Sequence, residues 1–145
     1  MVQLNSIDIS NVKEGDEKKL CVSIENMRLL RVLTIMVTNE EETLRMDALS
    51  SPPPNLWRLI LTGKLEKVPQ WFRSLQSLTH LYLRWLRLEE DLLTHVAALP
   101  HFGNLVLSNA YVGKQLCFRT DFPKLTKLEI HKLTGFIPLL VHFEM

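Results

Sequence analysis

The sequence predicts an α/β repeat fold, in which short parallel strands form one sheet and mixed segments cross behind it. Two observations lead to this fold class. The pattern Leu-x-x-Leu-x-Leu, with Ile or Phe in some Leu positions, occurs six times in 145 residues. In addition, hydrophobic residues make up 46% of the chain, which is ample for a buried core. The units begin, 22 to 26 residues apart, at Leu4, Leu30, Leu56, Leu78, Phe102 and Leu125.

This pattern and period are typical of a curved, right-handed leucine-rich-repeat solenoid. Alternate Leu and Ile side chains of each unit point into the core, and the residues between them point outward. We expect one strand per unit in a parallel β-sheet on the concave face, with helix, turn and extended segments on the convex face. We assign residues 1–133 to this domain and residues 134–145, where the pattern decays, to a divergent or truncated tail.

The first two return segments differ in kind. The first predicts a helix over residues 17–26, with Asp16 as its N-cap. The second ends in three consecutive prolines at 52–54, which cannot lie inside a helix and therefore predict an extended connector. The helical spacing in the first return is carried by Leu20, Ile24 and Met27.

The later returns become less regular along the chain. The third has Leu65-x-x-Val68-Pro69 followed by a predicted short helical turn with Trp71, Phe72 and Leu75. The fourth surrounds the acidic run 89–91 with apolar residues that should pack the back of the solenoid. The fifth, 110–122, is short and is expected to be extended.

Composition excludes several functional classes. A formal charge of +1 argues against a dedicated nucleic-acid binder, and no apolar run approaches the length of a membrane helix. Two cysteines without a visible secretory signal favour a reducing intracellular compartment. Neither a zinc-binding spacing of His and Cys nor a G-x-S-x-G motif is present, so we expect no enzyme activity, no cofactor and no metal.

Longer motifs resemble a known family. Ser-Pro-Pro-Pro-Asn-Leu-Trp-Arg-Leu at 51–59 and Gly-Lys-Leu-Glu-Lys-Val-Pro-Gln-Trp-Phe at 63–72 are similar to repeats of plant disease-resistance proteins. The resemblance is to the coiled-coil class of nucleotide-binding leucine-rich-repeat (CC-NB-LRR) receptors, and it covers residues 1–133. The phosphate-binding motif G-x-x-x-x-G-K-[ST] of such receptors is missing from this sequence.

The resemblance implies a protein-recognition module of innate immunity, located in the cytoplasm or peripherally at the plasma membrane. In a full receptor it would sense a pathogen effector or a guarded host protein and restrain the nucleotide-binding module. An alternative is a free-standing, truncated repeat protein that binds a receptor or itself without sensing a ligand. A third possibility is weak cation binding by Glu89, Glu90 and Asp91.

Two candidate binding sites follow from the outward positions of the units. The first is an aromatic and basic patch that would contact an acidic protein surface, because Trp, Tyr and Arg are enriched at binding hot spots; its alternative is a solvated strand face with cation–π pairing. The second is an apolar cluster, unless the second return folds over it. The first consists of Arg58, His80, Tyr82, Arg84 and Trp85, and the second of Val32, Met36, Val37 and Ile60.

Overall fold

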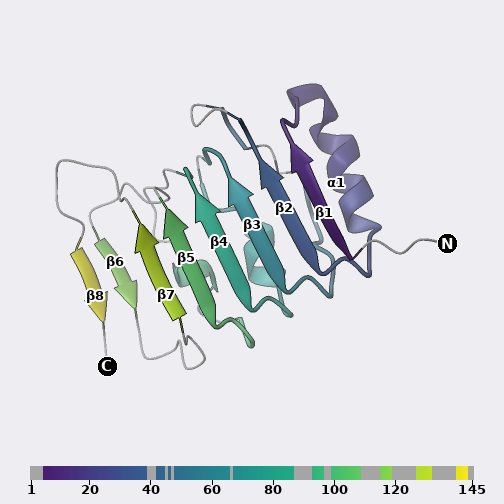
Figure 1. Cartoon of the computed structure of the whole chain (residues 1–145). Coiled ribbons are helices and arrows are strands. Elements are labelled where there is room, and N and C mark those ends of the chain that lie inside the picture. Colours follow the sequence, from purple (N-terminus) through teal and green to yellow (C-terminus); the bar gives the residue numbers. More distant parts are fainter. Residues whose placement is uncertain are drawn as a thin grey trace.

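The computed structural model describes residues 5–38, 42–44, 46, 48–65, 67–86, 93–96, 99–108, 115–118, 127–131 and 140–143. Six strands, one from each predicted unit, form a parallel sheet in the order β1-β2-β3-β4-β5-β7 (Figure 1). The predicted repeat solenoid is therefore confirmed. The strands are β1 (Ser6–Ser10), β2 (Val32–Met36), β3 (Arg58–Thr62), β4 (His80–Arg84), β5 (Asn104–Ser108) and β7 (Lys127–His131).

The strands pair so that equivalent positions of successive units lie side by side. Leu59 of β3, for example, is paired with Leu33 of β2 and with Leu81 of β4. The ladder continues one residue beyond the strands, where the N–H of Val37 donates to the carbonyl of Thr62 at 3.0 Å. Because the register is repeated without a slip, inward side chains stack in rows and outward side chains form parallel rows on the other face.

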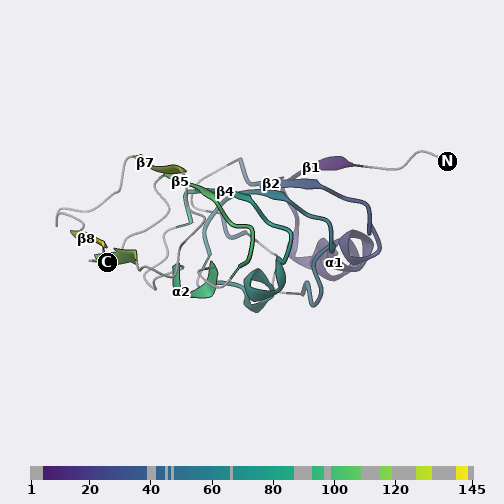
Figure 2. The same ribbon diagram turned by 90° about the horizontal axis from the view of Figure 1, so that it is seen from below.

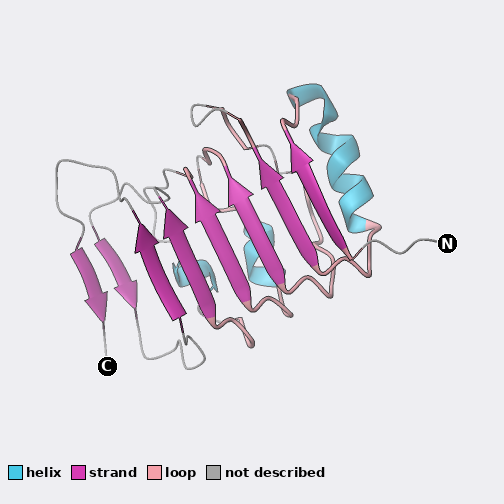
Figure 3. Ribbon diagram, in the orientation of Figure 1, coloured by secondary structure: helices cyan, strands magenta, loops and turns pink. Residues whose placement is uncertain are grey.

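The back of the sheet carries the helical segments (Figures 2 and 3). The first return contains the 3-10 helix η1 (Glu14–Asp16) and the helix α1 (Glu17–Glu25), which confirms the predicted helix. Asp16 occupies the N-cap position but makes no side-chain cap hydrogen bond. The predicted helical turn of the third return is the 3-10 helix η2 (Gln70–Ser74), and α2 (Leu93–Val96) lies in the fourth return.

A second, two-stranded parallel sheet pairs β6 (Gln115–Phe118) with β8 (Leu140–Phe143). β6 shows that the fifth return contains extended chain, as expected. β8 lies within the segment assigned to the tail, so this segment contributes a strand beside the fifth return. The division of the chain at residue 133 stays a prediction.

The core lies between the main sheet and the returns. Leu33, Leu59 and Leu81 are fully buried, and on the back of the sheet Cys21 and Ile24 are fully buried as well. The buried indole of Trp71 donates its Nε1–H to the carbonyl of Met46 at 3.0 Å, so two neighbouring returns are joined inside the core. Leu86, Val96 and Leu99, which were predicted to pack the back of the solenoid, are buried too. Leu20 and Met27 of the first return are only partly buried and pack against this core.

Polar contacts join the first return to the proline connector. The carboxylate of Glu25, at the end of α1, accepts hydrogen bonds from the Ser50 N–H at 2.6 Å, the Ser50 hydroxyl at 2.8 Å and the Ser51 N–H at 3.3 Å. These bonds, first of all the one from the Ser50 backbone, lower the pKa of Glu25 below its ordinary value. The carboxylate therefore favours its charged form while it holds the connector.

Candidate functional site

The face of the sheet opposite the helices, here called the open face, carries the first, third and fifth residue of each strand, of which Thr34 and Thr62 are buried. In Figure 2 the described helices lie on the other side of the sheet. From β2 to β5 the open face is built from three parallel rows. These rows are Val32, Arg58, His80 and Asn104; Thr34, Ile60, Tyr82 and Val106; and Met36, Thr62, Arg84 and Ser108.

Arg58 is held between two aromatic rings on this face. Its guanidinium carbon lies 5.1 Å from the ring centroid of Trp57 and 5.6 Å from that of Tyr82. The Nε atom is buried without a hydrogen-bond partner, and no described residue forms a hydrogen bond or ion pair with the two Nη groups. The rings therefore position the cation by cation–π contact, and its two Nη groups are not occupied by an acid among the described residues.

His80 is fixed beside Arg58 by the same tryptophan. The rings of His80 and Trp57 meet edge to face, with centroids 5.2 Å apart and an angle of 83°. The Thr79 hydroxyl lies 2.7 Å from His80 Nδ1 and donates to the Trp57 carbonyl at 3.1 Å. The Thr79 hydroxyl therefore links the His80 ring to the Trp57 backbone, and the donor of the bond between the hydroxyl and Nδ1 depends on the tautomer of the ring.

Arg84 and Trp85 form a second cation–π pair at the end of β4. The Arg84 guanidinium carbon is 5.6 Å from the Trp85 ring centroid, and the Arg84 side chain is exposed. Trp85 has a φ of +62°, in the left-handed region that bulky residues rarely adopt. The equivalent positions of two other units are occupied by Asn11, with φ +56°, and Gly63, with φ +149°. These two residue types tolerate positive φ far better than Trp does.

The charged side chains of the described strands in this region all have the same sign. The strand residues of β2 to β5 include two arginines and one histidine but no Asp or Glu. Across the part of the chain that the structure describes, neither Arg58 nor Arg84 has a carboxylate partner. The open face between β3 and β4 is therefore a basic surface lined with aromatic rings.

The structure brings four of the five residues of the first candidate site onto two adjacent strands, and the fifth, Trp85, directly follows β4. Arg58 is paired with His80, and Tyr82 and Arg84 follow on β4. Trp57 joins them, although it occupies the second place of its unit rather than the third, fifth, seventh or eighth place, from which outward side chains are expected. An aromatic residue directly before the strand was the signal that could have found it. We call the six residues the aromatic–basic patch: Trp57, Arg58, His80, Tyr82, Arg84 and Trp85.

The second candidate site is only partly present on the open face. Met36 is 39% exposed, and Val32 and Ile60 are half-buried. The assignment of Val37 to this exposed cluster is wrong, because its side chain is only 6% exposed. A side chain on Gly63 would come within 3.1 Å of Val37 Cγ2, so Val37 turns inward against the space that this glycine leaves open.

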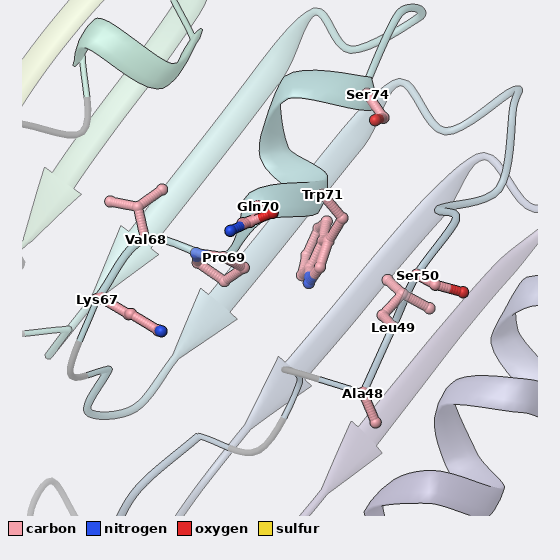
Figure 4. A pocket seen from close by; sticks show the side chains of 9 residues that line it. All are labelled: Ala48, Leu49, Ser50, Lys67, Val68, Pro69, Gln70, Trp71 and Ser74. Atoms are coloured by element: carbon pink, nitrogen blue, oxygen red, sulfur yellow. The ribbon is translucent and has the colours of Figure 1, made fainter.

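A cleft of about 540 Å³ lies on the back of the solenoid, between residues 48–50 of the second return and residues 67–74 of the third return (Figure 4). Among the described residues that line it, Lys67 is the charged one, and the aromatic side chain of Trp71 is 3% exposed. The combination of arginine and aromatic side chains that is typical of a recognition site therefore lies on the open face rather than in this cleft.

Within the described ranges, no group of three or more His, Cys, Asp or Glu is arranged to hold a metal ion. The acidic run 89–91 lies outside those ranges. None of the described helices is long and apolar enough to span a membrane.

Comparison with known proteins agrees with this architecture. Residues 1–143 match the family described as "Leucine-rich repeat region". The chain belongs to this leucine-rich-repeat family. It is also 38% identical over 130 residues to Disease resistance protein RPM1 of Arabidopsis thaliana. This alignment covers 90% of the chain but 14% of RPM1, so the chain corresponds to a small part of that protein. No solved structure gives a significant match.

Proposed function

We propose that this chain is a protein-recognition module of a plant intracellular immune receptor and has no enzymatic activity of its own. Within such a receptor it would sense an effector or a guarded host protein and restrain the nucleotide-binding module. The similarity to RPM1 supports the defence role, and leucine-rich repeats generally serve protein interaction. The observation that carries the proposal is the aromatic–basic patch on the open face.

The patch has the physical properties of a binding hot spot. Cation–π contacts with Trp57 and Tyr82 already hold Arg58, so it loses less side-chain freedom on binding than a solvated arginine would. Its charge is uncompensated by described neighbours, and therefore an acidic partner would gain charge-assisted hydrogen bonds. Trp85 and Tyr82 add apolar area beside these charges. An acidic protein surface is the partner that this arrangement fits.

The proposal can be tested with an isolated nucleotide-binding module from a plant disease-resistance receptor. The full chain should bind it, and replacing Arg84 and Trp85 together by Ala should weaken binding by about tenfold or more, since each hot-spot residue contributes roughly 1–2 kcal/mol. Arg73→Ala is the matched control, because Arg73 is an exposed arginine of η2 on the back. Titration calorimetry measures both affinities.

The same titration separates the alternative function. A free-standing adaptor would bind an intact receptor, or itself, and not the isolated module. Self-association in analytical ultracentrifugation, together with no binding to the module, would favour the adaptor. Unchanged affinity of a folded Arg84/Trp85 double variant would exclude the aromatic–basic patch as the contact surface.

A further inference from the structure

We propose that the open face binds an acidic amphipathic helix that lies across β2, β3 and β4. This inference rests on the proposed function, because it specifies the partner segment that the aromatic–basic patch would contact. Three features of the open face support it: the order of apolar and basic side chains across the strands, the spacing of the strands, and the Nη groups of Arg58, which have no hydrogen-bond partner among the described residues.

The side chains change character from one strand to the next. β2 presents Val32 and the exposed Met36, and Ile60 of β3 continues this apolar area. Positive charge begins with Arg58 on β3 and reaches its most exposed point at Arg84 on β4. A partner that matches this order has apolar side chains at one end of the contact and carboxylates at the other.

Spacing favours a helix over an extended peptide. Neighbouring strands lie about 4.8 Å apart, and an α-helix rises about 5.4 Å per turn, so a helix across the strands places one turn over each strand. In an extended peptide, side chains on one face repeat about every 6.6 Å, which does not match the strand spacing. A peptide lying along a single strand would contact either the apolar or the basic region alone.

The register also specifies the spacing within the partner. Met36 and Arg84 lie in one row, joined through Thr62 of the strand between them, and are therefore about 9.6 Å apart along the sheet. Residues seven apart on a helix are about 10.5 Å apart on the same face. We infer that an apolar side chain over Met36 and an Asp or Glu over Arg84 are separated by seven residues in the partner, with an intermediate turn over Thr62 and Ile60 of β3.

Arg58 supplies the fixed point of this interaction. Its guanidinium is held by rings on two sides, and its buried Nε leaves the Nη end to meet the partner. Because the guanidinium of Arg58 lies over the ring of Tyr82, one row away from Arg84, a carboxylate on the side of the helix that faces the starts of the strands can accept from these Nη groups. Because the rings already restrict the arginine, binding requires little rearrangement of this side chain.

A display experiment tests the proposal without knowledge of the natural partner. Two libraries, one of helical scaffolds with randomised surface positions and one of unstructured 12-residue peptides, are selected for binding to the full 145-residue chain. The selected binders are then titrated against the wild-type chain and against three variants. These are the double variant Arg58→Ala/Arg84→Ala, Met36→Ser, and the control Arg73→Ala. Circular dichroism confirms that each variant is folded.

The expected result is enrichment of helices with an apolar residue and an Asp or Glu seven positions apart. These should bind the double arginine variant at least tenfold more weakly, lose affinity for Met36→Ser, and bind the Arg73→Ala control unchanged. If the selected peptides bind in an extended conformation and still depend on Arg58 and Arg84, the helical partner is contradicted but the proposed recognition surface is not. If the affinity of the selected binders does not depend on either arginine, both the helical partner and the proposed recognition surface are contradicted.

Discussion

The backbone of Trp85 offers a sharp test of the physical reasoning. The perturbation is a pair of substitutions, Trp85→Ala and Trp85→Gly, which both remove the ring and its cation–π contact with Arg84. They differ in a single respect, because only glycine lacks the Cβ that makes a φ of +62° unfavourable. The difference in unfolding free energy between the two variants therefore reports the backbone strain, reduced by the greater freedom of glycine in the unfolded chain.

The size of the difference in unfolding free energy follows from two opposing effects. A non-glycine residue in the left-handed region costs roughly 1–2 kcal/mol, whereas glycine loses about 0.4–1 kcal/mol through the greater freedom of its unfolded chain. The Trp85→Gly variant should thus be more stable than the Trp85→Ala variant by about 0.5–1 kcal/mol. With a urea dependence of about 2 kcal/mol per molar, the unfolding midpoint rises by roughly 0.25–0.5 M.

Urea unfolding of the full chain, followed by circular dichroism, measures this difference. The matched control is the neighbouring residue Arg84, which lies in β4 and has no positive φ. There the order should be reversed, with Arg84→Ala more stable than Arg84→Gly by roughly 0.5–1 kcal/mol. If the Trp85→Gly variant is no more stable than the Trp85→Ala variant, the backbone at Trp85 is not strained and the prediction is wrong.

Three further predictions concern the packing behind the sheet. Gly63→Ala should lower the free energy of unfolding by more than about 1 kcal/mol in urea unfolding, because φ is +149° and the new Cβ would lie 3.1 Å from Leu44 Cβ; an unchanged midpoint would contradict this. Trp71→Phe should cost about 1–3 kcal/mol in the same assay, since the Met46 carbonyl would lose the buried indole donor. The lowered pKa of Glu25 means that its contribution to stability is present above the unfolded pKa and is lost as pH falls through the lower folded pKa. Between pH 5 and 2, stability should therefore decline less steeply in Glu25→Gln than in wild type, and parallel curves would refute the role of this carboxylate.

Periodicity carried much of the predictive power for the sheet. Each Leu-x-x-Leu-x-Leu unit predicted one strand, and the regular pairing of Leu33, Leu59 and Leu81 confirms that equivalent positions align. This succeeds because a strand buries every second residue, and a one-residue shift would expose the leucines. The helix over the first return was also predictable, because Leu20 and Ile24 have helical spacing.

The candidate site was predictable only in outline. Alternation along the strands identified Arg58 and Tyr82 as outward residues, but it could not show that Trp57 closes the other side of the guanidinium. Val37 was misplaced for a similar reason. Its direction depends on a space beside Gly63 in the next unit, which is a contact between units rather than a property of either segment.

The amino-acid sequence by itself determined the repeat architecture, the parallel strand order and the set of outward positions, because these depend on local periodicity and on burial of leucine. Only the tertiary structure decided the strained backbone of Trp85, the ring-held geometry of Arg58 and the inward turn of Val37. The contact of Arg58 with Tyr82 and that of Val37 with Gly63 join residues 24 (82−58) and 26 (63−37) positions apart in the chain. Local periodicity does not report such contacts, because they form only when stacking of the units places neighbouring strands about 4.8 Å apart.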